Sequence, residues 1–104
     1  MATYHHYGVP TAHRPEGAAY IEAGGVWGTN PDDHPYRIEF LCFDADSPMH
    51  ELVRTKPHVA FLVDDLDAAV AGQNVIVEPF QATDELRVAF ITDGDALLEL
   101  VERF

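Results

Sequence analysis

The sequence contains an internal repeat, and this repeat constrains the fold more than any other feature of the chain. Each half begins an apolar run with a histidine, His6 in the first half and His58 in the second. Each half then has a Thr-Asn or Thr-Asp turn, followed by an apolar run that contains a glutamate, Glu39 or Glu99. A repeat of this kind indicates two similar supersecondary units that bury a common core.

The second half has the clearer pattern of secondary structure. Residues 58–63 form an apolar run, and Asp64 and Asp65 directly after it can cap a helix, which we expect at about 65–72. Residues 74–78, 86–91 and 97–101 are rich in apolar and β-branched side chains and are separated by turn residues. The predicted order is strand, helix and three strands.

The first half is broken by glycine and proline, yet four strand-like runs remain at 4–9, 18–23, 26–29 and 36–43, with one helical turn at 48–53. From His6 to Thr29 is 23 residues, whereas from His58 to Thr92 is 34. The difference is close to the length of an average helix with its connection. We therefore predict an α+β fold of paired βαβββ modules, in which the first module lacks its helix and eight strands form one cupped, mixed sheet.

Two glutamates within apolar runs need a partner. Glu99 has apolar neighbours on both faces of its run, and strand parity places Glu39 on one face with Leu41. Burying an ionised carboxylate alone is too costly, which leaves protonation, an ion pair or a cation. Together with His6 and His58, the two carboxylates suit a divalent transition metal such as Zn²⁺, Ni²⁺, Mn²⁺, Fe²⁺ or Co²⁺.

Each of these four residues also has a simpler interpretation. A histidine on a strand is often a hydrogen-bonded structural residue, and Glu99 could face solvent at a sheet edge. His5 competes with His6 as a ligand, because the two are adjacent and strand parity puts them on opposite faces. The repeat is what favours His6, Glu39, His58 and Glu99 as one set.

Composition narrows the classes of partner. A chain of 104 residues is about the size of one small domain. Its 18 acidic residues against 6 Lys and Arg give a charge of −12, which disfavours nucleic acid and anionic membrane surfaces. The single cysteine, the lack of a long apolar run and the lack of a signal sequence lead us to expect a cytoplasmic protein.

At residues 58–66 (HVAFLVDDL), 88–95 (VAFITDGD) and 98–101 (LELV), the sequence resembles the vicinal oxygen chelate superfamily, which includes glyoxalase I, methylmalonyl-CoA epimerase, extradiol dioxygenases and bleomycin-resistance proteins. The first half resembles it through residues 6–9 and 38–40. The resemblance implies a single glyoxalase-like domain over 1–104, with a degenerate first module at 1–46 and a complete module at 57–104.

The resemblance also implies a function. In this family two modules hold a metal at the floor of the cup, and the matching positions here are His6, Glu39, His58 and Glu99. The isomerase and lyase branch fits best, with Glu39 or Glu99 as the group that moves a proton of a small oxygen-chelating substrate through an enediolate or enolate. Glu39 favours the glyoxalase type over the epimerase type, although residues that would contact glutathione have no counterpart.

A second interpretation is a small-molecule sequestering protein of the bleomycin-resistance type. It would use aromatic side chains as stacking surfaces, and the candidates are Trp27, Tyr36, Phe43, Phe61 and Phe90. Under either interpretation we expect a homodimer, since a cupped sheet of this size leaves its convex face or its strand edges partly uncovered.

Overall fold

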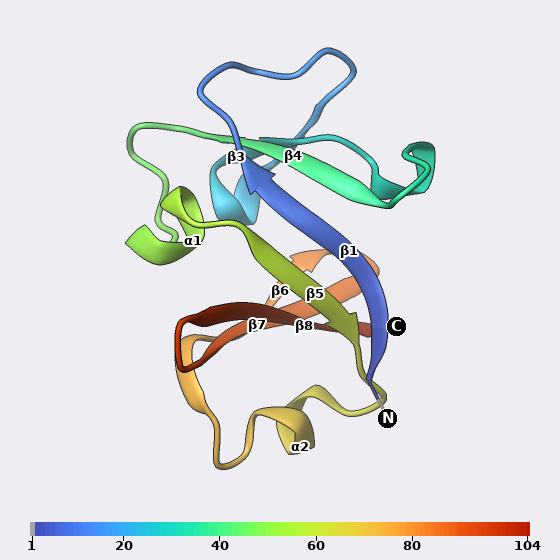
Figure 1. Cartoon of the computed structure of the whole chain (residues 1–104), viewed down its shortest axis with the longest axis vertical. Helices are drawn as coiled ribbons and strands as arrows, with labels where there is room; N and C mark the ends of the chain where they lie inside the picture. The colour runs from blue at the N-terminus through green and yellow to red at the C-terminus, as the bar shows by residue number, and fades with distance from the viewer. Residues whose placement is uncertain (1) are drawn as a thin grey trace.

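The computed structural model describes residues 2–104, which form an eight-stranded sheet with short helices (Figure 1). The strands are β1 (Thr3–Pro10), β2 (Ala19–Ile21), β3 (Val26–Gly28), β4 (Ile38–Phe43), β5 (His58–Leu62), β6 (Asn74–Thr83), β7 (Leu86–Asp93) and β8 (Ala96–Arg103). The α-helices are α1 (Glu51–Thr55) and α2 (Leu66–Val70), and the 3₁₀ helices are η1 (Glu22–Gly24) and η2 (Pro31–Asp33). No helix within residues 2–104 has the length and apolar character needed to cross a membrane.

The strand order reflects the internal repeat. The sheet runs β2-β3-β4-β1-β5-β8-β7-β6, so the two halves of the chain occupy its two sides in mirrored order. The first strands of the halves, β1 and β5, pair antiparallel at the centre, and each is parallel to the last strand of its own half, β4 or β8. The remaining pairs are antiparallel. The predicted α+β fold with paired modules and a curved mixed sheet is confirmed.

The register makes the two halves equivalent residue by residue. Gly8 of β1 lies opposite Glu39 of β4, and Ala60 of β5 lies opposite Glu99 of β8. The histidine of each half therefore lies two residues before the partner of its glutamate. Between β1 and β2 the described chain has no α-helix, as the spacing argument predicts, whereas α2 follows β5 in the second half.

Apolar side chains fill both sides of the second module. On the concave side, one buried cluster contains Val53, Ala60, Val88, Phe90, Leu97 and Val101. On the convex side, Leu66 of α2 packs on Ala89, Ile91 and Leu100. The side chain of Asp65 caps this helix by accepting a hydrogen bond from the Ala68 amide. The alternation of inward and outward residues along β7 and β8 thus separates a helix-covered face from an open, cupped face.

Several boundaries differ from the sequence prediction, among them those of β6 and α2. Strand β6 continues to Thr83, whereas the sequence predicts an end at Pro79. The pairing of β6 with β7 is irregular between Val77 and Phe80, and at such an irregularity proline is tolerated because no ladder hydrogen bond is lost. Helix α2 ends at Val70, before Gly72, and is therefore shorter than predicted.

Candidate metal centre

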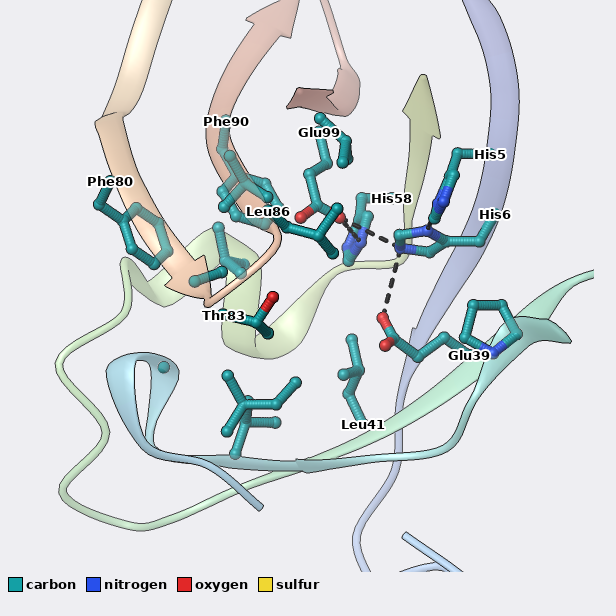
Figure 2. A pocket seen from close by; sticks show the side chains of 18 of the residues that line it. His5, His6, Glu39, Leu41, His58, Phe80, Thr83, Leu86, Phe90 and Glu99 are labelled. Carbon is teal, nitrogen blue, oxygen red and sulfur yellow. Dashed lines mark hydrogen bonds and ion pairs between the residues drawn. The ribbon is translucent and has the colours of Figure 1, made fainter. Parts of the chain in front are cut away.

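Four central strands bring His6, Glu39, His58 and Glu99 together on the concave face of the sheet (Figure 2). His6 lies on β1 and His58 on β5, while Glu39 and Glu99 lie on the flanking strands β4 and β8. The mirrored strand order explains the convergence, because the equivalent strands of the two halves meet at the centre. Each module alone supplies one imidazole and one carboxylate.

The donor atoms of the four side chains lie close to one another. His6 Nε2 is 3.3 Å from Glu39 Oε1 and 3.1 Å from Glu99 Oε1. His58 Nε2 is 3.1 Å from the same oxygen of Glu99. Donor atoms of His6, Glu39 and His58 all lie within 4.8 Å of one another. This clustering of two nitrogen and two carboxylate ligands is typical of sites for borderline divalent metals.

The site is buried, and its charged groups strongly affect one another's pKa values. His6, His58 and Glu99 are 5%, 2% and 8% exposed, so their charges are poorly screened by water. Burial alone would lower the pKa of His6, but the Glu39 and Glu99 carboxylates outweigh it and raise the pKa to about 9. Burial alone would raise the pKa of Glu99, but His58 and His6 hold it well below its usual value. Without a metal, the site thus favours protonated His6 beside ionised Glu99.

One nitrogen at the centre of the cluster has no hydrogen-bond partner. His6 Nε2 is close to both carboxylates, yet neither contact has hydrogen-bond geometry, and the atom is buried. Buried polar atoms without a partner are rare and costly in proteins. A cation between this nitrogen and the two carboxylates would satisfy all three groups, so the residues present fit a divalent metal. His58 Nδ1, on the far side of its ring, is also buried without a partner.

His5 lies beside the cluster rather than on the opposite face that strand parity predicts. Tyr4 and His6 of β1 pair with the consecutive residues Phe61 and Ala60 of β5, so His5 is the extra residue of a β-bulge. The bulge turns His5 toward the cavity, where its Nδ1 is 2.8 Å from His6 Nδ1. Strand parity is therefore wrong here. His6 contacts the glutamates, and His5 holds the other edge of the His6 ring.

Gly8 is a further residue of the site that sequence reasoning overlooks. The His58 ring lies directly over it, and a Cβ built on Gly8 would lie 2.3 Å from His58 Cε1 and 2.4 Å from Nε2. No side chain fits between β1 and this imidazole. A glycine within an otherwise apolar strand is the available sequence signal, because it often marks such a close approach.

The cluster forms the floor of a cavity of about 360 Å³. Apolar side chains from both halves form its walls, including Leu41, Phe80, Leu86 and Phe90 (Figure 2). Of the five aromatic residues predicted as stacking surfaces, Phe43 and Phe90 line this cavity, and the other three do not. Trp27 instead lies under the Arg14 guanidinium, 3.6 Å from the ring centre.

Comparisons with solved structures identify the fold. A hypothetical protein from Bacillus halodurans C-125 has a TM-score of 0.65 at 15% identity, over 99% of this chain and 95% of that one. Methylmalonyl-CoA epimerase from Mycobacterium tuberculosis has a TM-score of 0.58 at 21% identity, over 97% of this chain and 87% of that one. No family model matches the sequence, and no curated protein matches it. The chain therefore shares the fold of these two proteins, and the predicted α+β fold of paired modules in one cupped sheet is confirmed.

Proposed function

We propose that the chain is a metal-dependent lyase or isomerase of the glyoxalase type, acting on a small substrate that chelates through neighbouring oxygens. The observation that carries the proposal is the buried His6 Nε2, which lies beside two carboxylates at the floor of an open cavity without a hydrogen-bond partner. Buried polar atoms in native proteins rarely lack a hydrogen-bond partner. The epimerase of the same fold supports an isomerase-type reaction in such a cup.

The proposed ligands are His6, Glu39, His58 and Glu99. When bound, a divalent metal would supply Lewis-acid stabilisation of the negative charge that proton removal leaves on the substrate oxygens. The chain's own contribution is to hold the substrate in an apolar cavity and to move a proton. No Lys or Arg forms an ion pair with either glutamate among the described contacts, so both carboxylates remain available to the site.

The two glutamates are proposed to have different roles. Glu99 contacts both imidazoles at 3.1 Å and its side chain is 11% exposed, so it is fixed in place as a ligand. Glu39 contacts only His6, at 3.3 Å, and its side chain is 16% exposed toward the cavity. Glu39 is therefore the carboxylate that can reach a bound substrate and remove its α-proton, and then return the proton to the product.

Metal binding is tested first, by elemental analysis of protein purified without a histidine tag. We expect about one metal per chain, with occupancy lost in His58→Ala and in Glu99→Ala. The matched control is His13→Ala, which removes an exposed histidine. If both site variants keep the full occupancy of the parent protein, the proposed site is wrong.

Proton transfer is tested by exchange of the substrate α-proton with deuterated water, followed by NMR. Glu39→Gln should abolish exchange while metal occupancy falls little, and Glu99→Gln should reduce both. Glu78→Gln, an exposed substitution on β6, is the control. Exchange at the parent rate in Glu39→Gln would refute this base assignment. If no α-hydroxycarbonyl compound exchanges with the parent protein, the enzyme proposal fails.

The apolar cavity also favours a second candidate, a protein that sequesters an aromatic compound. Phe43, Phe80 and Phe90 line the cavity and supply the surface such a role needs. The two candidates differ in their dependence on metal. A sequestering protein binds its compound equally well after treatment with a chelator, whereas the proposed enzyme loses binding of an oxygen-chelating ligand.

A further inference from the structure

The cavity above the candidate metal centre has a polar floor and a mainly apolar wall. Its floor carries the two imidazoles and two carboxylates, while most of its wall is apolar. The wall residues that face this floor come from β4, β6 and β7 and include Leu41, Phe43, Phe80, Leu86, Val88 and Phe90. Burying an apolar group of a ligand against such a wall is favourable. A polar group buried there would lose its hydrogen bonds to water without replacement.

Cations are scarce at this cavity. Of the six Lys and Arg residues of the chain, all of which are described, Arg103 alone lines it. The other five do not line the cavity, although Arg37 pairs with Asp32 and Arg54 donates to the Met49 carbonyl, both at its lining. Arg14 lies over Trp27, Lys56 donates to the Asp95 carbonyl, and Arg87 pairs with Asp67 and Glu102.

Acidic groups other than the two site glutamates also lie at this cavity, and one of them, Asp32, is paired with Arg37. Asp32 and Glu85 both line the cavity, and the chain as a whole carries −12. Phosphate recognition in proteins relies on Arg or Lys clusters or on helix N-termini. A ligand carrying several phosphates would therefore meet repulsion at the mouth of this cavity.

We infer that the substrate is a small, uncharged α-hydroxycarbonyl or 1,2-dicarbonyl compound with an aromatic or branched apolar body, free of any phosphorylated carrier. This inference rests on the proposed function, because the neighbouring oxygens are the part that meets the metal centre. It departs from what the neighbour's name indicates for that protein, a coenzyme A thioester. A cavity of about 360 Å³ is near the lower end of the range for small-molecule sites, which suits a single ring with its substituents.

The test uses a pair of ligands with the same chelating oxygens, measured calorimetrically on the Zn²⁺-loaded protein. Benzohydroxamate carries a phenyl group and acetohydroxamate a methyl group. We expect benzohydroxamate to bind about 10-fold to 100-fold more tightly, as burial of a ring predicts. Phe80→Ala should remove most of this difference, while the control Leu52→Ala, which changes an exposed residue away from the cavity, should leave it unchanged.

A second pair of ligands tests the charge. α-Hydroxyacetophenone and mandelyl-CoA both carry a phenyl group and neighbouring oxygens, but the latter is attached to a phosphorylated carrier. We expect the neutral compound to bind at least about 10-fold more tightly at low salt, where charge repulsion is strongest. Tighter binding of the thioester would overturn the inference.

The outcomes separate this inference from the proposed function. Equal affinity for the two hydroxamates refutes the apolar substrate class and leaves the chelating metal centre supported. If Zn²⁺-loaded protein binds neither hydroxamate, the chelating centre itself is wrong, and the substrate class falls with it.

Discussion

Replacing Gly8 by alanine is the sharpest test of how the strands position the candidate metal centre. The added Cβ would lie 2.3, 2.4 and 2.9 Å from three atoms of the His58 ring, whereas ordinary contacts begin near 3.4 Å. The ring must therefore retreat by about 1 Å. It has little room to do so, because it is 2% exposed and its centre lies 5.2 Å from that of Phe90, at an angle of 89°.

The expected magnitude follows from two opposing effects. Overpacking a filled core costs about 1–3 kcal/mol, while alanine is intrinsically better than glycine within a strand by about 0.5–1 kcal/mol. We expect Gly8→Ala to lower the free energy of unfolding of the metal-free protein by about 1–2 kcal/mol. Displacement of one ligand should also weaken Zn²⁺ binding by about 10-fold to 100-fold, a loss similar to that caused by mutations around metal ligands.

Urea denaturation and calorimetric titration with Zn²⁺ measure the two effects. The control is Ala60→Gly, at the equivalent position of β5, which faces His6 across the strand pair. It should lose about 1–2 kcal/mol of stability through backbone entropy and the loss of a buried methyl group, without forcing either imidazole to move, and keep the Zn²⁺ affinity of the parent protein. If Gly8→Ala matches the parent protein in Zn²⁺ affinity, His58 is not held where the structure places it or is not a ligand.

Three other predictions follow from the same geometry. His5→Ala should weaken Zn²⁺ binding about 10-fold, because Nδ1 of His5 lies 2.8 Å from Nδ1 of His6 and orients that ring. His5→Gln should restore part of the affinity. Equal calorimetric affinities in the parent protein and both variants would contradict this. Zn²⁺ affinity should rise with pH from 6.5 to about 9, since the pKa of His6 is raised to about 9 and metal must displace its proton; a flat profile would contradict this. In the metal-free protein the stability contributed by protonated His6 should be complete below pH 6.5 and lost as pH rises through 9, which urea denaturation at several pH values measures. We also expect a dimer, with a mass by light scattering of about twice 11.6 kDa, because Phe40 is 37% exposed on the uncovered convex face; Phe40→Asp should favour the monomer, and a parent mass near 11.6 kDa would refute the prediction.

The two-module architecture could be predicted from the sequence because the same pattern of histidine, turn and glutamate occurs in both halves. One histidine before an apolar run is a weak signal, but His6 and His58 mark the same position in two strands that pair at the centre of the sheet. The spacing between each histidine and the following turn then indicates which module lacks a helix. The facing of the two glutamates follows as well, since both must lie on the cupped face to reach the histidines.

The remaining features depend on tertiary structure that no local pattern encodes. Strand parity places His5 on the wrong face because a β-bulge adds one residue to β1. The order of apolar and polar side chains in this strand does not indicate the bulge. Aromatic residues are equally ambiguous: Phe43 and Phe90 reach the cavity, whereas Trp27 lies elsewhere under Arg14. The sequence shows which aromatic residues are available, but the curvature of the sheet decides which of them face the cavity.

Among the described residues the first module lacks an α-helix, and this has little effect on the walls of the cavity. In the second module, α2 packs on Ala89 and Leu100, which point away from Phe90 and Glu99 on the same strands. A helix at the equivalent place would therefore cover the convex face, over Phe40, and would contribute no wall to the cavity. Side chains of β6 and β7 line the cavity on the concave side, above the candidate metal centre. Loss of that helix thus removes cover from the outer surface, where a second copy of the chain can replace it, and leaves the catalytic proposal intact.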